Sequence, residues 1–167
     1  AEAFEALERA GYHVRSAYTA VRNPSPTRFV YTDRLWQGAD MVGLGVASFG
    51  HINGVHMQNI DTFEAYLGAI EAGTIPLARA LRPTPEERMI REFVLQLKLG
   101  SIRPSYFAAK YGEDVVARYR EQFAELASEG YLTTGDDRVT LTREGLLQVD
   151  SLLPRFFKPE HAAVRYT

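Results

Sequence analysis

The sequence contains no cysteine among its 167 residues. Disulfides, thiolate nucleophiles and cysteine-bound iron–sulfur clusters are therefore excluded for this chain. No apolar run approaches the roughly 20 residues that cross a bilayer, so no membrane span is predicted. Neither sign of charge dominates, because 19 Lys and Arg face 21 Asp and Glu. No strong field would attract nucleic acid or an anionic membrane, and these features fit a cytoplasmic protein.

The first residues already read as a helix. The stretch AEAFEALERAG places its apolar side chains on one face, and Gly11 is a suitable C-terminal stop. A natural chain seldom begins inside a helix without a preceding cap. The sequence therefore predicts that this chain is a piece of a longer one.

Residues 12–60 carry two strand patterns. Residues 12–21 alternate in polarity and predict a strand, and two prolines make residues 22–29 a loop. Met41–Phe49 is a continuous apolar run bounded by turn residues, which favours a buried strand of a parallel sheet. A helix, a strand, a loop and a strand are half of an α/β repeat, so this part would leave strand edges unpaired.

A helix with its connector is predicted at residues 61–83. Asp61 and Glu64 have the spacing of a capping box, and Gly73 would end the helix. We place a domain boundary near Pro83. The three predicted parts are residues 1–60, 61–83 and 84–167.

Residues 84–167 predict a helical domain. Thr84 and Glu87 form a second capping box, and Phe93 and Leu97 lie on the apolar stripe of the helix that follows. Pro104 opens a second helical pattern that Gly112 ends, and Gly130 ends a third. Residues 131–142 read as a hairpin around Gly135, and a last helix is broken by Pro154. Three helices, a hairpin and a helix are a winged-helix pattern.

The winged-helix pattern raises the question of DNA binding. Such a module needs cations on its third helix and its wing to contact phosphate. The wing tip here carries Asp136 and Asp137 beside a single Arg138. Along the third helix, carboxylates outnumber arginines: Glu113, Asp114, Glu121, Glu125 and Glu129 against Arg118 and Arg120. A packing or lid module is therefore favoured over a DNA-binding regulator, and we expect no nucleic-acid partner.

Several polar residues and glycines are candidates for a site. Gly43 and Gly45 mark either a close backbone approach to a ligand or close packing, and without a third glycine and a following helix they make no dinucleotide fingerprint. His51 and His56 are either a metal or haem pair or polar residues of a loop; no HExxH or carboxylate cluster supports zinc.

Trp36 and Gln37 form a second candidate pair. They are either a flat ring for stacking on a base with an amide beside it, or a buried indole next to a surface amide. His13 and His161 have no such company in the sequence, and we take them as structural or exposed.

Separated blocks of the chain resemble the carboxyl half of coproporphyrinogen-III-oxidase-like radical SAM proteins. The group includes oxygen-independent oxidases (dehydrogenases), haem chaperones and haem-utilisation enzymes. The resemblance covers nearly the whole chain. The blocks that carry it, in the family's order, are WQGADMVGLGVASF, YLGAIEAGTIPLARA, EERMIREFVLQLK and LASEGYL with VTLTREGLLQVDSL.

The resemblance implies an α/β plus α fold. Residues 1–60 would be the last helix and strands of a partial TIM-like barrel, and residues 84–167 a winged-helix-like domain covering its mouth. The other part of the barrel, with the Cys-x3-Cys-x2-Cys loop that holds a 4Fe–4S cluster, would lie outside this chain and act as its partner. Strand ends of such barrels carry active-site loops, so residues 49–59 would lie at the mouth.

The resemblance also implies site residues. Trp36 and Gln37 fall where the oxidases have an aromatic–Gln pair near S-adenosylmethionine, and Gly43 and Gly45 match the Gly-x-Gly of the last strand. Two further positions match the cofactor surroundings: Ala17 at the end of the preceding strand, and Phe49 beside a second cofactor molecule. Many relatives have GPGAHS where this sequence has GVASFG.

The expected function follows from that resemblance. In the parent enzyme the cluster cleaves S-adenosylmethionine to a 5′-deoxyadenosyl radical, and the protein orients the reactants. This piece would supply part of the cofactor wall and a substrate lid, with His51 or His56 contacting a tetrapyrrole. The piece alone would bind no metal or cofactor and be inactive. The alternatives are a haem chaperone or haem-utilisation protein of the same superfamily, and a winged-helix regulator.

Overall fold

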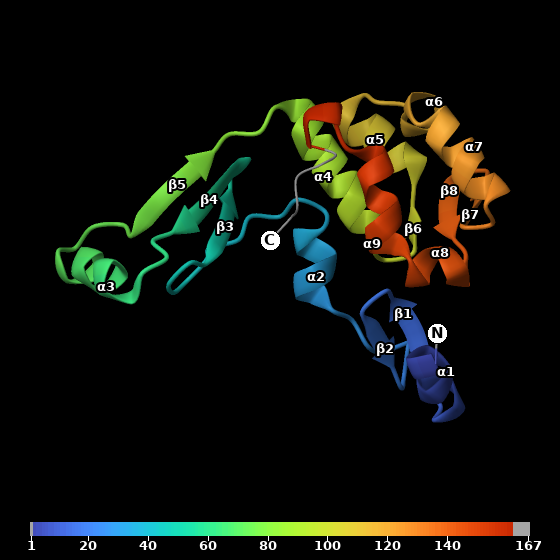
Figure 1. Cartoon of the computed structure of the whole chain (residues 1–167), viewed down its shortest axis with the longest axis horizontal. Coiled ribbons are helices and arrows are strands. Elements are labelled where there is room, and N and C mark those ends of the chain that lie inside the picture. The colour runs from blue at the N-terminus through green and yellow to red at the C-terminus, as the bar shows by residue number, and fades with distance from the viewer. Residues whose placement is uncertain (1, 162–167) are drawn as a thin grey trace. The chain divides into compact units, whose positions relative to one another are not determined.

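The computed structural model describes residues 2–161. Ala1 and residues 162–167, which belong to the first and last predicted parts, lie outside the described residues. The described residues divide into two compact units (Figure 1): residues 2–29 together with 89–161, and residues 30–88. The predicted division at residues 60 and 83 remains a prediction. In the described part of the chain, no helix is both long enough and apolar enough to cross a membrane.

The larger unit contains most of the helices. Its elements are α1 (Glu2–Arg9), β1 (His13–Ser16), β2 (Thr19–Val21), α4 (Pro85–Leu97, which begins in the other unit), β6 (Ser101–Ile102), α5 (Pro104–Tyr111), α6 (Val115–Arg118), α7 (Arg120–Ser128), β7 (Leu132–Gly135), β8 (Arg138–Leu141), α8 (Arg143–Leu147), α9 (Val149–Leu152) and the 3-10 turns η1 (Leu153–Phe156) and η2 (Pro159–His161). Strands β6, β8 and β7 pair antiparallel in that order. The hairpin predicted at residues 131–142 is confirmed.

Local sequence signals explain where these helices begin and end. The Thr84–Glu87 capping box is confirmed: the Thr84 amide donates to a Glu87 carboxylate oxygen at 2.7 Å, and the Glu87 amide donates to the Thr84 hydroxyl at 3.2 Å. Gly112 ends α5 in the left-handed conformation, φ 68°. The predicted third helix is two helices, α6 and α7, because Tyr119 leaves helical geometry at φ −106° and ψ 27°.

The core of this unit is built around Phe93 of α4. Its side chain is fully buried, and its ring centroid lies 4.9–6.1 Å from those of four other aromatic residues: Phe107, Tyr119, Phe123 and Phe156. Leu97, one turn further along α4, is also buried. Both lie on the apolar stripe that the helical periodicity predicts.

Residues 12–21 form a hairpin, so the prediction of one strand there is wrong. Strands β1 and β2 pair antiparallel, and Ala17 and Tyr18 lie in the turn between them. The Ser16 hydroxyl accepts from the Tyr18 amide at 3.2 Å and lies 2.8 Å from the Thr19 hydroxyl. This local bonding turns the chain where alternation in polarity suggests that it continues.

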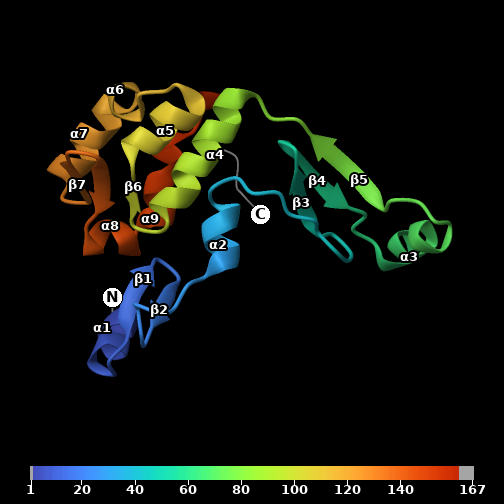
Figure 2. The same ribbon diagram turned by 180° about the vertical axis from the view of Figure 1, so that it is seen from behind.

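The smaller unit contains a three-stranded antiparallel sheet (Figures 1 and 2). Its elements are α2 (Val30–Leu35), β3 (Phe49–Ile52), β4 (Val55–Asn59), α3 (Phe63–Glu71) and β5 (Leu77–Leu81), with sheet order β3-β4-β5. The helix predicted after Asp61 is present, but its N-cap residue is Thr62, so the Asp61–Glu64 capping box is wrong. Gly73 follows the helix with φ 69°, as expected for a stop.

The buried strand predicted at Met41–Phe49 is wrong. Residues 42–48 form a loop, and Met41 alone makes an isolated bridge, to His51. Gly45 and Ala47 have positive φ, 102° and 58°, which is incompatible with an extended strand. Every strand pair among residues 2–161 is antiparallel. The predicted barrel end is therefore not confirmed.

The segment predicted as a polar loop, residues 49–59, forms a β-hairpin. Its two central residues are Asn53 and Gly54, with φ 48° and 75°. Positive φ at both positions and the Asn-Gly sequence are typical of a type I′ turn. This turn fixes the register that brings His51 opposite His56.

Candidate functional site

The structure places seven of the eight predicted site residues in the smaller unit. Trp36 and Gln37 follow helix α2, and Gly43 and Gly45 lie in the 42–48 loop. The other three lie on neighbouring strands: Phe49 and His51 on β3, and His56 on β4. Ala17 lies in the larger unit.

The 42–48 loop is held by hydrogen bonds to Asn59 at the end of β4, to Ile60 and to helix α3. The Asn59 side-chain amide donates to the carbonyl oxygens of Gly43 and Gly45, at 3.0 Å each. The Gly45 amide donates to the Tyr66 hydroxyl at 3.1 Å. The Ala47 amide donates to the Ile60 carbonyl at 2.9 Å. The loop is thus fixed at several points, which suits a segment that would present backbone groups to a ligand.

The two glycines of the loop have different roles in the structure. A Cβ on Gly43 would lie 2.2 Å from the Phe49 carbonyl oxygen, so Gly43 is required for close packing of the loop on strand β3. A Cβ on Gly45 would meet only the Ser48 hydroxyl, at 3.5 Å, and the neighbouring Leu44 is exposed. Gly45 is therefore the glycine at which a ligand has room to approach the backbone.

Replacing Gly43 with alanine tests this packing. We expect Gly43→Ala to lower the free energy of unfolding by about 1–3 kcal/mol, because the new methyl group collides with backbone that cannot rotate away. Gly68→Ala, in α3, is the matched control: no atom lies within 4 Å of its added Cβ, so it should leave stability unchanged or raise it. Chemical denaturation measures both, and equal stability of the two variants would contradict this role for Gly43.

His51 and His56 lie opposite each other on strands β3 and β4. Their ring centroids are 6.2 Å apart, and Phe49 stacks on His56 at 5.5 Å with an interplanar angle of 14°. His51 is only 5% exposed, whereas His56 is partly exposed. The hairpin therefore brings together three of the predicted residues, which the sequence places only in a loop.

Trp36 and Gln37 lie at the C-terminal end of helix α2. The Trp36 amide donates to the Thr32 carbonyl at 3.0 Å, and the Gly38 amide donates to the Leu35 carbonyl at 3.0 Å. Gly38 then leaves the helix with φ 79°. Trp36 is partly buried and Gln37 is exposed. The indole is therefore neither fully buried, as a core residue would be, nor fully exposed, as a free stacking surface would be.

Part of the helical region matches a known family. Residues 84–147 match the family model described as the HemN C-terminal domain. Their match, together with the structural likeness below, confirms the resemblance of the chain to the carboxyl-terminal portion of HemN-like radical SAM proteins.

Two known proteins are similar to the chain, one in sequence and one in structure. It is 26% identical over 113 residues to the heme chaperone HemW of Bacillus subtilis strain 168, covering 67% of this chain and 30% of HemW. Its structure resembles that of coproporphyrinogen III oxidase (HemN) from Escherichia coli, a radical SAM enzyme, with a TM-score of 0.74 and 19% identity; the match covers 93% of this chain and 39% of HemN. The likeness to HemN shows the fold alone, and the chain spans less than half of either relative.

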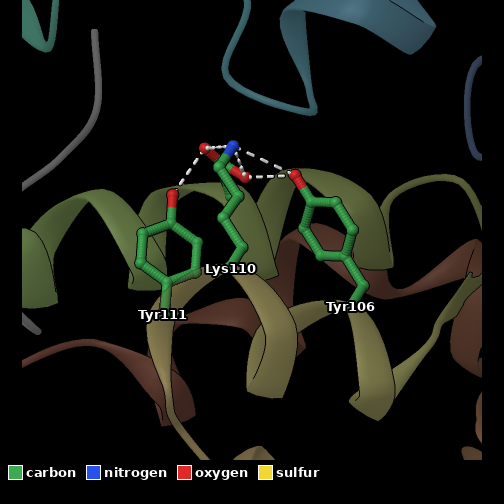
Figure 3. A network of polar contacts seen from close by, with 4 residues as sticks. Tyr106, Lys110 and Tyr111 are labelled. Atoms are coloured by element: carbon green, nitrogen blue, oxygen red, sulfur yellow. Dashed lines mark hydrogen bonds and ion pairs between the residues drawn. The ribbon is translucent and has the colours of Figure 1, made fainter.

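Helices α4 and α5 are joined by a polar network that the sequence did not predict (Figure 3). Glu92 of α4 is buried, and its carboxylate accepts hydrogen bonds from three side chains of α5. Tyr111 donates at 2.5 Å, Tyr106 at 2.7 Å and Lys110 at 2.8 and 2.9 Å. Glu92 could have indicated this network, because it is a charged residue directly before Phe93 on an apolar helix face. A buried charge needs hydrogen-bond partners.

The network changes the ionisation of two of its members. Burial raises the pKa of Tyr106, and the hydrogen bond to Glu92 raises it further. Burial lowers the pKa of Lys110, but hydrogen bonding to Glu92 and Tyr106 raises it more, so the net shift is upward. Every member is hydrogen-bonded within the network. We therefore assign it to joining α4 and α5 inside the larger unit.

The described part of the chain contains no metal centre built from His, Cys, Asp or Glu side chains. Among residues 2–161, no three His, Cys, Asp or Glu side chains are grouped so as to hold a metal ion. The sequence itself has no cysteine for an iron–sulfur cluster. Cluster ligands of a radical SAM protein would have to come from residues outside this chain.

Proposed function

We propose that this chain is the carboxyl-terminal portion of a HemN-like radical SAM protein that acts on a tetrapyrrole, and that it supplies part of the S-adenosylmethionine pocket wall and a lid over the substrate. The observation that carries the proposal is the likeness in fold to HemN over 93% of the chain. The HemN C-terminal domain at residues 84–147 supports it independently.

The exposed apolar side chains of the smaller unit support the proposal that another part of the protein packs against it. Large apolar side chains are exposed on its helices, loops and outer strand, including Tyr31, Val42, Leu44, Phe63, Ile75 and Leu81. An exposed apolar surface of this kind marks an interaction site. Both known proteins are much longer than this chain. We propose that the remaining part of the barrel, in the whole protein, covers this apolar surface.

The residues of this chain and the cofactors of the whole protein would have different roles. S-adenosylmethionine and a 4Fe–4S cluster, bound elsewhere in the whole protein, would supply the radical chemistry. Trp36 offers a partly buried ring for stacking on the adenine, and Gln37 an exposed amide beside it. Gly45 offers backbone that a ligand can approach, on a loop fixed by Asn59 and Tyr66. These residues would bind and orient the cofactor and exclude water from it.

The HemN C-terminal domain would serve as the lid. Helix α4, strand β6, helices α5 to α7 and the β7–β8 hairpin follow one another in the order of a winged helix. The Asp137 carboxylate, at the wing, accepts from the Ser105 amide at 2.9 Å and from its hydroxyl at 2.5 Å. A wing tied to α5 through a carboxylate favours packing within the protein over contact with DNA phosphates.

Replacing Trp36 tests the pocket wall. In the whole protein, Trp36→Ala should weaken S-adenosylmethionine binding by about 5–100-fold, because aromatic stacking on a base contributes about 1–3 kcal/mol. Val116→Ala, which truncates an exposed side chain of α6, is the control and should leave affinity unchanged. Isothermal titration measures both. Unchanged affinity in Trp36→Ala would mean that the indole serves packing alone.

A second candidate function is haem handling without oxidase activity. The observation that favours it is the sequence similarity to a protein named heme chaperone HemW. His56, with Phe49 stacked on it, is the better exposed of the two histidines and is the residue that we propose for haem contact. Hemin added to the whole protein should then shift its Soret band. A shift that survives His56→Ala would exclude His56 as the contact.

A further inference from the structure

We propose that Met41, His51 and His56 form a binding site for a soft transition-metal cation, with Cu(I) as the best match, on one face of the β3–β4–β5 sheet. The site lies wholly within the smaller unit. It requires neither a cluster nor S-adenosylmethionine, so it is independent of the proposed radical SAM function.

The strand register places the three side chains on one face. His51 exchanges both backbone hydrogen bonds with Met41: the Met41 amide donates to His51 O at 2.7 Å, and the His51 amide donates to Met41 O at 2.8 Å. On its other side His51 is paired with His56. Residues directly opposite each other in antiparallel strands project to the same face of the sheet. Met41, His51 and His56 therefore form a row across three segments.

The register also brings the two imidazoles close together. Since the backbone groups of His51 bond to Met41, the His51–His56 pair is of the non-hydrogen-bonded type, in which side chains approach more closely. The observed centroid separation is 6.2 Å. An imidazole nitrogen binds a metal ion at about 2.0–2.1 Å, so two rings on one ion have centroids roughly 5–6.5 Å apart. The separation of the two rings falls within this range.

Neighbouring aromatic residues hold two of the three donors in place. The Phe49 ring stacks on His56, and the Tyr31 hydroxyl donates to the Met41 sulfur at 3.2 Å. A thioether sulfur has two lone pairs, so this bond leaves one for a metal. Supporting contacts of this kind orient ligands before the ion binds.

The donor set selects the cation. Two imidazoles and a thioether suit Cu(I), whereas Mg²⁺ and Ca²⁺ require oxygen ligands. The third ligand is a methionine, which explains why the site is not a group of three His, Cys, Asp or Glu. His51 is only 5% exposed, so a bare ion can reach it where the broad plane of a porphyrin cannot; haem contact would be confined to the better exposed His56.

Competition with a chromophoric chelator tests the site. Under anaerobic, reducing conditions the chain should take one equivalent of Cu(I) from bicinchoninate. His56→Ala should lower the affinity at least about 100-fold, because loss even of a residue that supports a ligand costs 10–100-fold. His13→Ala removes an exposed histidine of β1 in the other unit and is the matched control, with unchanged affinity expected.

A second variant separates the thioether from the imidazoles. Met41→Leu conserves volume and should weaken Cu(I) binding while leaving Co(II) binding, followed by its visible absorption, unchanged. Circular dichroism checks that each variant is folded. Three results would each overturn the proposal: no Cu(I) uptake by the unaltered chain, uptake unaffected by His56→Ala, or equal losses in His56→Ala and His13→Ala.

Discussion

Phe93→Ala is expected to lower the free energy of unfolding of the larger unit by about 3–5 kcal/mol, the range for deleting a buried aromatic ring. Phe93 is fully buried, and four aromatic rings surround it. These rings come from α5, from α7 and its preceding cap, and from η1, so the cavity cannot be closed by moving a single segment. Thermal and urea denaturation of the chain would both show the loss.

An exposed phenylalanine provides the control for this prediction. Phe63 in α3 is 62% exposed, so Phe63→Ala should change the free energy of unfolding by no more than about 0.5 kcal/mol. If Phe93→Ala destabilised the chain no more than Phe63→Ala does, the aromatic cluster would not be the core of the larger unit.

Glu92→Ala is expected to cost about 2–3 kcal/mol, the range for a buried hydrogen bond to a charged group. The side chain of Glu92 is 6% exposed and bonds to three side chains of α5. The cost stays below that of a fully buried ion pair, because the Lys110 ammonium can reach water when Glu92 is removed. Glu86→Ala, on an exposed residue in the first turn of the same helix, is the control and should be nearly neutral.

The same network predicts a dependence of stability on alkaline pH. The raised pKa values of Lys110 and Tyr106 mean that the folded state holds both protons more tightly than the unfolded state does. Their contribution is complete below about pH 10, the unfolded value, and is lost as pH rises through the folded pKa values. The unaltered chain should lose stability there more steeply than Glu92→Ala. Parallel curves for the two proteins would contradict the assignment.

The helical part of the fold could be predicted because its signals are local. The Thr84–Glu87 box, Pro104 and Gly112 mark helix ends by backbone chemistry that does not depend on distant residues. Phe93 and Leu97 were expected to be buried from periodicity alone. Glu92 was missed because the network that satisfies it joins two helices, and pairing between helices has no sequence period.

The strands of the smaller unit were predicted poorly for a physical reason. An apolar run such as Met41–Phe49 is typical of a buried strand, but its glycines let the chain turn, and Asn59 holds it as a loop. The hairpin that follows could have been predicted from its Asn53–Gly54 turn. The Asn-Gly sequence is a stronger indication of a hairpin than the surrounding polar residues are of a loop. The pairing of His51 with His56 depends on that register and could not come from spacing in a presumed loop.

The roles proposed for Trp36, Gln37, Ala17, Gly45 and Phe49 rest on the resemblance to radical SAM proteins. A Cβ on Gly43 would collide with the Phe49 carbonyl, whereas the space beside Gly45 is open, so a ligand-facing role stays a proposal for Gly45 alone. The structure also gives Phe49 a stacking partner that the resemblance does not predict. Sequence similarity alone therefore overstates how alike the two glycines are.

Cleavage of S-adenosylmethionine by the whole protein tests the central claim most directly. The protein would be reconstituted anaerobically with iron and sulfide, reduced, and given S-adenosylmethionine and coproporphyrinogen III, and 5′-deoxyadenosine would be measured by chromatography. The account predicts 5′-deoxyadenosine that accumulates with turnover of the tetrapyrrole and decreases in Trp36→Ala. A protein that binds its cluster and hemin but forms no 5′-deoxyadenosine would contradict the account.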